Sequence, residues 1–346
     1  MHKTANILIT WYLKNKRDLP WRKTTDPYRV WLSEIMLQQT RVAQGKPYYL
    51  KFIKAFPTVF ELADVSEEQV LKLWQGLGYY SRARNLHATA KLVAYELDGK
   101  FPTNYKDLKK LKGVGDYTAS AIASICYKEP KAVVDGNVFR VLSRLYGIAT
   151  PINTTEGEKL FNKLAQDLID LKQPDIYNQA IMEFGAMHCT PKKPLCASCV
   201  FSDKCDALKT KKTTELPVKL KKIKVRNRYF NYIVPISNAT SSILNKRSKK
   251  GIWANLYEFP LLESEHAINT SQVIELLKSE KLFSESFELS LYNEKPVVHK
   301  LSHQHLYVHF WIVTTQEQFD NAIPLSELEK YPVPVLIANF IKEFSF

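Results

Sequence analysis

The sequence lacks the features that mark a membrane protein or a disulfide-bonded one. No apolar run reaches the roughly 18 residues that a membrane-spanning helix needs, and residues 1–10 do not have the form of a signal peptide. The 346 residues include only five cysteines, and four of these crowd together, whereas a disulfide scaffold would spread them along the chain. Glycine and proline, at 11 and 17 residues, are too scarce for a largely disordered chain. We therefore expect a compact cytoplasmic protein.

Acidic residues are also in deficit. The chain has 35 Asp and Glu against 49 Lys and Arg, which gives a formal net charge of +14. A surface with this charge attracts polyanions, either a nucleic acid or an acidic membrane. Because the sequence has no membrane segment, a nucleic acid is the better interpretation.

The length predicts about two domains, at roughly 150 residues per domain. In the first part, apolar residues recur at spacings of three and four, as at Leu71 and Trp74, which is typical of helices. After Arg228 the runs become β-branched and aromatic, as in strands, with one helical stretch near residues 271–281. We predict an all-α domain over residues 1–209, a basic linker over 210–228 and an α+β domain over 229–346.

The predicted linker is strongly basic. Residues 201–230 contain ten Lys and Arg against three Asp and Glu, with little apolar periodicity. Such a segment is either simply solvated or also in contact with DNA phosphates, and the composition favours neither.

Four cysteines lie within seventeen residues, in the pattern Cys189-x6-Cys196-x2-Cys199-x5-Cys205. Four thiolates suit either a [4Fe–4S] cluster or a tetrahedral zinc ion, and the spacing alone does not decide between them. Unliganded cysteines are the plain alternative, but a cytosolic chain rarely clusters free thiols by chance. The fifth cysteine, Cys126, stands among apolar residues, and we expect it in the core.

Two carboxylates stand out by their surroundings. Glu34 lies in an otherwise apolar helical stretch, so we expect it to be buried with a raised pKa and able to donate a proton; a helix-surface charge is the alternative. Asp135 follows the turn Gly113-Val114-Gly115 by about twenty residues and precedes a helix predicted to begin near Val138. It could be only the N-cap of that helix, although capping does not exclude catalysis.

Residues 111–119 and 133–140 together resemble the helix-hairpin-helix DNA glycosylases, and the cysteine spacing is similar to that of members related to endonuclease III. The resemblance implies a [4Fe–4S] cluster on the four cysteines. Because ligation by all four leaves no open position for water, we do not expect the cluster to take part in hydrolysis. It implies that Asp135 is the catalytic carboxylate. It also implies that Gly113 and Gly115 expose backbone N–H groups to a DNA phosphate.

The segments Leu19–Arg22, Trp31–Thr40 and Gly76–Leu86 resemble the adenine-specific mismatch glycosylases in particular. Releasing adenine requires a proton on the purine and negative charge beside the sugar, roles that fit Glu34 and Asp135 respectively. Bifunctional endonuclease III relatives carry a lysine at the position of Tyr117. Without an amine there, we predict base excision without efficient strand cleavage.

This resemblance implies further site residues. Tyr117 would hold the sugar, Asn137 would hold the Asp135 carboxylate, and Gln39 and Tyr79 would enter the duplex when adenine flips out. The other implied contacts with adenine or DNA are Arg17, Trp21, Arg22, Gln38 and Thr40. A buried tryptophan is as often core as ligand contact, so Trp21 has both interpretations.

The C-terminal half resembles the Nudix-like recognition domain of the same family. Residues 251–260 are not followed by a Glu-rich hydrolase signature, so we expect reading of the lesion rather than phosphate hydrolysis. Ser302 and His303 would sense oxidised guanine, although Leu301 replaces the usual aromatic residue before the serine. A metal site on His299, His303, His305 and His309 is less favoured, because residues 306–310 alternate as a strand and carboxylates are absent nearby.

The sequence thus predicts a monomeric adenine glycosylase acting on double-stranded DNA with adenine opposite 8-oxoguanine or guanine, at the nucleoid in the bacterial cytoplasm. Two other functions stay open. One is a bifunctional pyrimidine glycosylase-lyase on the same fold, and the other is a non-enzymatic, metal-stabilised DNA-binding module. The presence of both Glu34 and Asp135 argues against the second.

Overall fold

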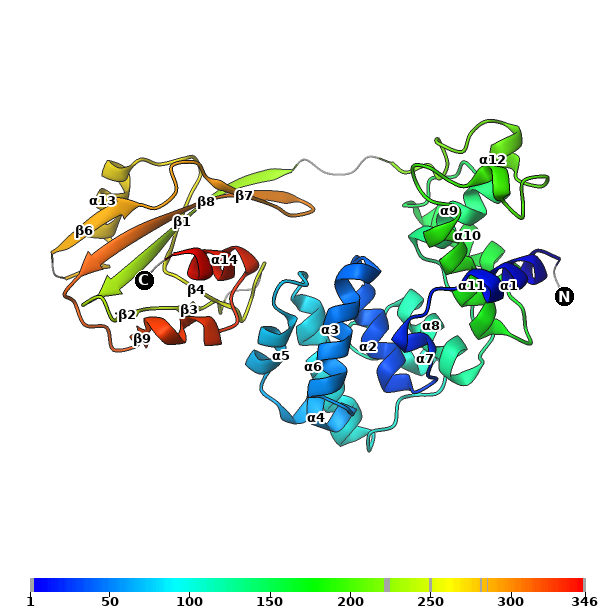
Figure 1. Cartoon of the computed structure of the whole chain (residues 1–346), viewed down its shortest axis with the longest axis horizontal. Coiled ribbons are helices and arrows are strands. Elements are labelled where there is room, and N and C mark those ends of the chain that lie inside the picture. The colour runs from blue at the N-terminus through cyan, green and yellow to red at the C-terminus, as the bar shows by residue number, and fades with distance from the viewer. Residues whose placement is uncertain (1–2, 221–224, 249–250, 281, 285, 345–346) are drawn as a thin grey trace. The chain divides into compact units, whose positions relative to one another are not determined.

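The computed structural model describes residues 3–220, 225–248, 251–280, 282–284 and 286–344. The chain separates into two compact units, one formed by Met1–Asp64 with Asn85–Lys221 and the other by Val65–Arg84 with Lys222–Phe346 (Figure 1). None of the described helices is both long and apolar enough to cross a membrane.

The first unit is helical. Its helices are α1 (Lys3–Asn15), α2 (Pro27–Leu37), α3 (Val42–Ala55), α4 (Val59–Asp64), α7 (Tyr105–Leu108), α8 (Asp116–Tyr127), α9 (Gly136–Leu145), α10 (Thr155–Leu168), α11 (Pro174–Met187) and α12 (Asp206–Lys209), with most of α6 (Ser81–Lys91) and the short helical turns η1 (Pro20–Arg22), η2 (Leu92–Glu96) and η3 (Cys196–Ser198). In α2, local sequence explains where the helix starts. The Asp26 side chain accepts a hydrogen bond from Tyr28 N, and Pro27 occupies the first helical position.

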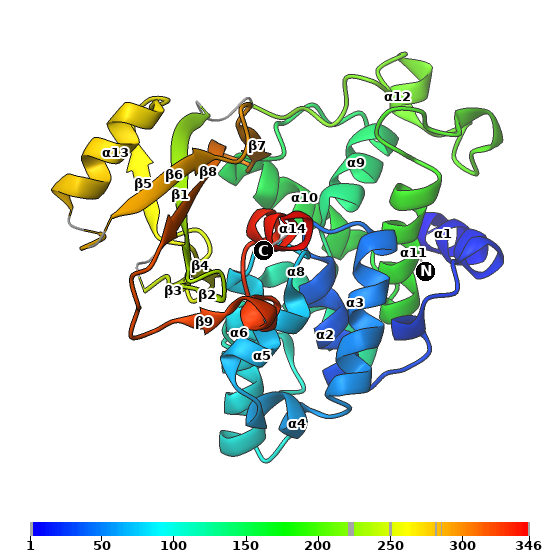
Figure 2. The ribbon, with the colours of Figure 1, turned by 60° about the vertical axis from the view of Figure 1, so that its left-hand side comes forward.

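Helix α11 is central to this unit. It packs against α1, α8 and α9 (Figure 2). Phe184 of α11 meets Trp11 of α1 edge to face, with ring centres 5.0 Å apart. Gly185 lets α11 approach α9 closely, because a Cβ there would stand 2.6 Å from Asn137 Cβ. This close approach brings residues of α11 beside the start of α9.

The second unit holds helix α5 (Glu67–Trp74) and a seven-stranded sheet. Strands β6, β8, β1, β2 and β9 follow one another in that order, while β5 pairs with β1 and β7 pairs with β8. The strand bounds are β1 (Arg226–Ser237), β2 (Ser241–Ser242), β5 (Leu261–Ser264), β6 (Phe287–Leu291), β7 (Val297–Lys300), β8 (Gln304–Thr315) and β9 (Ile323–Pro324), with β3 (Asn245–Lys246) and β4 (Tyr257–Glu258) forming a separate pair. The long strands β1 and β8 run parallel.

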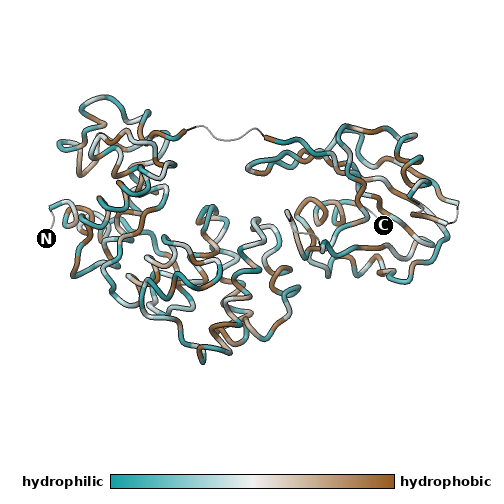
Figure 3. The backbone as a smooth tube through the Cα atoms, turned by 180° about the vertical axis from the view of Figure 1, so that it is seen from behind, coloured by the Kyte–Doolittle hydropathy of each residue, from teal (hydrophilic) through white to brown (hydrophobic). Residues whose placement is uncertain are grey.

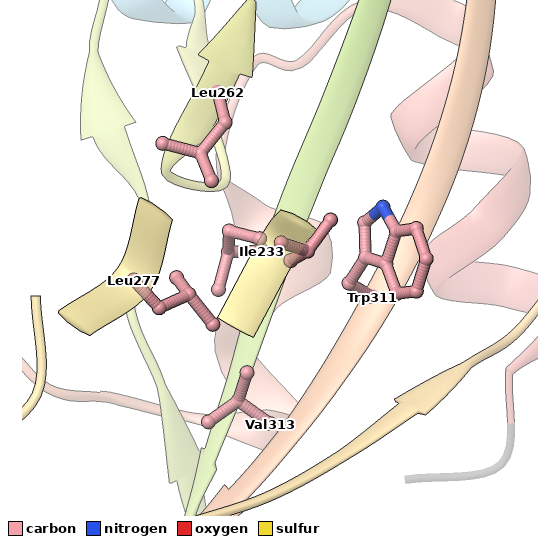
Figure 4. Packing of buried hydrophobic residues seen from close by; sticks show 6 residues of the cluster. Ile233, Leu262, Leu277, Trp311 and Val313 are labelled. Atoms are coloured by element: carbon pink, nitrogen blue, oxygen red, sulfur yellow. The ribbon is translucent and has the colours of Figure 1, made fainter. Parts of the chain in front are cut away.

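Helices α13 (Thr270–Ser279) and α14 (Val335–Glu343), with the turn η4 (Leu325–Lys330), complete this unit. Successive residues of a strand point to opposite faces of the sheet. On β8, Trp311 packs with Leu277 of α13 (Figure 4). The neighbouring Phe310 instead stacks on Phe340 of α14, with ring centres 4.1 Å apart. The two helices therefore cover opposite faces of the sheet.

The hydropathy of the chain follows this arrangement. Hydrophobic and hydrophilic segments alternate along the elements (Figure 3), as expected where each element buries one face. Strand β8 alternates buried and half-buried residues over its first half and is almost wholly buried over the second. The buried Trp311 keeps its Nε1–H satisfied by donating to Asn231 Oδ1 at 3.1 Å.

The structure confirms the predicted order of a helical part followed by a part with strands and helices. The helix expected near residues 271–281 is α13, and residue 281 itself lies outside the described residues. Strand β1 begins at Arg226, three residues before the expected start. Residues 221–224 of the predicted linker lie outside the described residues, and the predicted domain boundaries stay a prediction.

Ile233 tests the core of the second unit. Its side chain is fully buried in the cluster with Leu262, Leu277, Trp311 and Val313. Ile233→Ala should lower the free energy of unfolding by about 2–5 kcal/mol, because it removes apolar contacts and leaves a cavity. Calorimetry of the full chain would measure this. The control Val298→Ala, at a 43% exposed position of β7, should change it by no more than about 0.5 kcal/mol.

Candidate active site

A cavity of about 180 Å³ opens among α2, η1, α8, α9 and α11 of the first unit. This space is far larger than the roughly 10–15 Å³ that one water molecule needs, so an organic ring has room to enter. The predicted site residues that line it are Arg17, Trp21, Arg22, Glu34, Thr40, Tyr117, Asp135 and Asn137. The structure thus brings together residues that are up to 120 positions apart in the sequence, from Arg17 to Asn137 (137 − 17).

Glu34 occupies the inner face of α2 and is only 8% exposed. The pKa of Glu34 is raised to about 7, chiefly by burial and also by the nearby negative charge of Asp135, while a hydrogen bond from Tyr117 and the charge of Arg22 oppose the rise. A carboxyl group with this pKa is substantially protonated near neutrality. It can therefore donate a proton to a molecule in the cavity.

Asp135 is the N-cap of α9. Its Oδ1 accepts hydrogen bonds from the backbone N–H of Asn137 and Val138 at 2.9 and 2.8 Å, and Oδ2 accepts one from Asn137 Nδ2 at 2.7 Å. Burial raises the pKa of Asp135, and these hydrogen bonds oppose the rise. The structure therefore confirms that Asp135 caps α9 and places it on the cavity, and its catalytic role stays a prediction.

Tyr117 lies in the first turn of α8 and lines the same cavity as the two carboxyl groups. Its hydroxyl is 3.3 Å from Met182 Sδ and also hydrogen-bonds to the Glu34 carboxyl. A phenol has one proton to donate, and an oxygen acceptor that carries charge is stronger than a thioether sulfur, so the hydrogen bond to Glu34 prevails when that group is ionised. Burial and both neighbouring carboxyl groups raise the pKa of Tyr117 well above its usual value.

Glu183 was not predicted from the sequence, yet it organises one wall of the cavity. It is 1% exposed and accepts hydrogen bonds from Arg17 Nε at 2.8 Å and Arg22 Nη2 at 2.8 Å. Burial alone would raise the pKa of Glu183, but the bonds from the two arginines outweigh it and lower the pKa to about 2. The available signal was an acidic residue within the apolar part of a helix, the same signal that singled out Glu34.

Trp21 also lines the cavity, and it is 8% exposed. Its ring packs edge to face against Tyr49 of α3, with centres 5.2 Å apart. The residue is therefore both part of the core and a wall of the site.

A continuous set of hydrogen bonds leads away from Asp135. Asn137 donates to Asp135, and Asn137 Oδ1 in turn accepts from Arg140 Nη2 at 2.8 Å. Arg140 also donates to the backbone oxygens of Gly185 and Cys189, at 2.7 Å each. The orientation of the Asp135 carboxyl is therefore fixed by α9 itself and by the segment that begins the cysteine loop.

The four clustered cysteines line a second cavity, together with Arg144 and His188, and none forms a disulfide. Donors surround the sulfur atoms, since Arg144 Nη1 lies 3.5 Å from Cys189 Sγ and Phe201 N donates to Cys199 Sγ at 3.4 Å. Such donors stabilise metal-bound thiolates. Cys126 is separate from this group, half-buried on α8.

The hairpin between α7 and α8 is exposed at Gly113 and Gly115. Gly113 has φ of +81°, a conformation that favours glycine, and its position against Asn85 leaves no room for a Cβ. Gly115 is the N-cap of α8. Backbone N–H groups at the start of a helix can bind a phosphate, so the hairpin keeps the predicted geometry for DNA contact.

The residues expected to enter the duplex lie on exposed turns. Gln39 follows α2, is exposed and has φ of +55°. Its neighbour Gln38 donates from Nε2 to Thr118 Oγ1 at 3.0 Å, which ties this turn to α8. In the other unit, Tyr79 is 51% exposed with φ of +49°, and its hydroxyl lies 2.8 Å from Ser302 Oγ.

Ser302 and His303 form the exposed turn between β7 and β8. Leu301 N donates to the Gln304 carbonyl at 2.8 Å and closes this turn. Both predicted reading residues are therefore accessible at the end of a two-stranded hairpin. Among the four histidines, His299 instead packs on Trp253, with ring centres 5.7 Å apart.

Two family models match the chain. Residues 32–167 match the HhH-GPD superfamily base excision DNA repair protein, and residues 232–343 match the NUDIX domain. Together with the observed elements, these matches confirm the predicted fold class, a helix-hairpin-helix glycosylase domain followed by a Nudix-like α+β domain.

Relatives with known names extend this likeness over most of the chain. The adenine DNA glycosylase of Buchnera aphidicola subsp. Schizaphis graminum is 35% identical over 305 residues, 88% of this chain and 85% of that protein. The adenine DNA glycosylase of Homo sapiens is 47% identical over 210 residues, 58% of this chain and 38% of that protein.

Solved structures give the same picture for the helical part. A thermostable thymine-DNA glycosylase superimposes with a TM-score of 0.56 at 29% identity, covering 60% of this chain and 95% of that one. A non-covalent endonuclease III–DNA complex has a TM-score of 0.52 and covers 60% of this chain and 94% of that one; at 22% identity it is similar in fold alone.

The buried Glu34 should leave a signature in stability. Its pKa is about 7 when folded and near 4.5 when unfolded, so the folded state holds the proton more tightly and loses stability as pH rises through this range. Glutamine does not ionise. From about pH 5 to pH 8, Glu34→Gln should therefore gain about 1–3 kcal/mol of unfolding free energy relative to wild type, measured by denaturant titration.

Glu183→Gln is the matched control for this measurement. The pKa of Glu183 is lowered to about 2, so its stabilising contribution is fully present above pH 4.5 and constant over the same range. Glu183→Gln should be less stable than wild type by an amount that does not change with pH. A pH-independent offset for Glu34→Gln would contradict the assignment of Glu34 as a buried, titrating acid.

Proposed function

The chain belongs to the adenine DNA glycosylase family, and from that premise we propose that it hydrolyses the N-glycosidic bond of adenine opposite 8-oxoguanine or guanine in double-stranded DNA. The single observation that carries the proposal is the pair of carboxyl groups, Glu34 and Asp135, on one cavity, with different hydrogen-bond partners. The enzyme would act as a monomer, at the nucleoid in the bacterial cytoplasm.

The two carboxyl groups divide the reaction between them. Neutral Glu34 gives its proton to the purine ring, so that adenine leaves as a neutral base when the bond to C1′ breaks. The Asp135 carboxylate faces the positive charge that develops on the sugar and stabilises it. Water then adds to C1′, and the proton that it releases returns to the carboxyl pair.

The other cavity residues hold and orient the reactants. Arg17 and Arg22, fixed by Glu183, present donors and charge at one wall, and Trp21 supplies an apolar surface for the base. Tyr117 stands where it can hold the sugar, and it offers no amine for a Schiff base. The predicted outcome is base release without efficient cleavage of the strand.

DNA would be held at several exposed elements. Phosphate binds at the N–H groups of Gly113 and Gly115, while Gln39 with its neighbours Gln38 and Thr40 enters the stack beside the flipped adenine. In the second unit, Tyr79 enters the stack, and Ser302 and His303 read the oxidised guanine. The predicted domain boundaries, residues 1–209, 210–228 and 229–346, would place Tyr79 in the glycosylase domain, whereas residues 65–84 belong to the second compact unit.

The four cysteines would hold a [4Fe–4S] cluster. Among the described residues, no three His, Cys, Asp or Glu side chains come as close together as a single metal ion needs. What supports the cluster is that the four thiols line one cavity, where Arg144 Nη1 and Phe201 N lie near the sulfur atoms of Cys189 and Cys199. When bound, the cluster would supply a fixed cross-link of the loop after α11 and no hydrolytic chemistry.

A glycosylase assay tests the proposed reaction. Duplexes would carry adenine opposite 8-oxoguanine, guanine or thymine, and we expect release from the first two only. Glu34→Gln should slow release by about 100-fold or more, since removing a general acid costs on the order of 10²–10⁴-fold, while DNA binding is retained. Release by Glu34→Gln at the wild-type rate would refute the acid assignment.

The same reactions distinguish the lyase alternative. In borohydride trapping, wild type should give little covalent adduct, because Tyr117 replaces the nucleophilic amine. Abundant adduct, or release of a pyrimidine rather than adenine, would support the bifunctional enzyme instead.

Metal analysis tests the cluster. The purified chain should contain about four irons and matching sulfide, with the visible absorption of an iron–sulfur protein. Cys199→Ser should lower the iron content and the thermal stability, because a ligand is lost. Cys126→Ser, outside the cluster cavity, should keep both. Stoichiometric zinc with no iron would show that the assignment is wrong.

A further inference from the structure

The segment between α5 and α6 forms a strained turn that presents Tyr79. Gly76, Gly78 and Tyr79 all have positive φ, at +96°, +78° and +49°. Glycine adopts this conformation easily, but a tyrosine does so only when its surroundings impose it. Tyr79 is 51% exposed, so packing of its own side chain cannot be the whole cause.

Arg82, at the start of α6, packs against this turn from the protein side. Its side chain is buried, at 9% exposed, and Nη2 donates to the carbonyl oxygens of Gly78 at 3.1 Å and Leu77 at 3.4 Å. The guanidinium carbon lies 5.6 Å from the centre of the Tyr79 ring and 5.3 Å from that of Trp74. One side chain therefore contacts both the backbone of the turn and the ring that the turn presents.

Trp74 at the end of α5 completes the arrangement. Its Nε1–H donates to the Gly78 carbonyl at 3.0 Å, so this one oxygen accepts from both Trp74 and Arg82. Trp74 is fully buried, which anchors the turn to the core. The carbonyl of Gly78 is thus fixed from two sides, and the direction of the next residue, Tyr79, follows from it.

Arg82 is an unusual choice for such a place. Burial disfavours its charge and lowers its pKa to about 10. A buried charge is costly unless it is hydrogen-bonded, and here the Leu77 and Gly78 carbonyls accept from the guanidinium. Guanidinium is planar, donates in a fixed fork and stacks on aromatic rings, and an ammonium group cannot do these things together.

We propose that Arg82 is a positioning residue that fixes the Tyr79 side chain for entry into the DNA duplex, through its bonds to the Leu77 and Gly78 carbonyls and its contacts with the Trp74 and Tyr79 rings. The inference rests on the proposed role of Tyr79 in base flipping and adds a residue that does not itself touch DNA.

A double-mutant cycle tests this. Single-turnover release of adenine opposite 8-oxoguanine is measured for Arg82→Lys, Tyr79→Ala and the double variant. Arg82→Lys keeps the charge but loses the fork, and it should slow release on the order of tenfold. If it acts through Tyr79, adding it to Tyr79→Ala should slow release by no more than about twofold. Losses that multiply would overturn the proposal.

A second measurement responds to positioning rather than to folding. With 2-aminopurine beside the mispair, wild-type binding should raise fluorescence as the stack opens, and Arg82→Lys should give a smaller rise at saturating protein. An unchanged rise would count against the proposal. This signal requires no bond cleavage, so it stays informative even if the chain releases no adenine and the proposed function fails.

Arg84→Lys is the matched control. Arg84 lies two residues further along α6, is half-buried and donates from Nη1 to the Ala254 carbonyl at 2.8 Å. Any loss that it causes should multiply with that of Tyr79→Ala.

If the thermal midpoint of Arg82→Lys shows that this variant does not fold, Trp74→Phe replaces it in the cycle. It keeps a ring but removes the hydrogen bond to Gly78. Trp74→Phe should slow adenine release in the wild-type background but add little to the slowing by Tyr79→Ala. If the two reductions in rate multiplied, the proposal would be refuted independently.

Discussion

Burial of two carboxyl groups on one cavity is the constraint on which the site depends. Removing a carboxylate from water is costly, and a second negative charge nearby raises the cost. The surroundings that compensate for this cost differ between the two groups. Asp135 accepts three hydrogen bonds, two of them from the N-terminus of α9, and so is the better-stabilised anion. Glu34 lies among apolar residues of α2, and its pKa is raised to about 7, so it keeps its proton at a pH below this value. These different surroundings fit the proposed division of the two groups into an acid and an anion.

The helical scaffold produces this difference between two groups that line the same cavity. Tyr117 in the first turn of α8 and Asn137 in the first turn of α9 line the cavity, and the backbone N–H groups of Asn137 and Val138 donate to the Asp135 carboxyl. Gly185 allows α11 to approach Asn137, and Arg140 joins that contact to the Cys189 carbonyl. The cysteine loop, although it lines a different cavity, therefore bears on the orientation of Asp135. This link gives a physical reason why a cluster without hydrolytic chemistry would matter to a hydrolase.

Local sequence signals predicted much of the fold and part of the site. Periodicity located the helices and the later strands, and the apolar neighbours of Glu34 indicated its burial, because these properties depend on residues close in sequence. Glu183 carried the same local signal as Glu34, but its role could not be predicted because its partners Arg17 and Arg22 lie more than 160 residues away, and only the packing of α11 brings them together. For the same reason, periodicity gave no sign that residues 65–84 cluster with the second unit. Contacts between distant segments leave no local pattern to read.

Several proposed functional positions depart from the rules of stable folding. Glu34 and Glu183 are buried acids, Arg82 is a buried cation, and Gln39 and Tyr79 have positive φ without being glycine. Each feature lowers stability by itself, so dense packing elsewhere must offset it. The offset is local: Arg82 rests on the fully buried Trp74, and Glu34 belongs to a helix whose Trp31, Leu32 and Met36 are fully buried. A well-packed helix can carry one costly side chain at a fixed position, and a reactive group needs that fixed position more than the chain needs the stability it gives up.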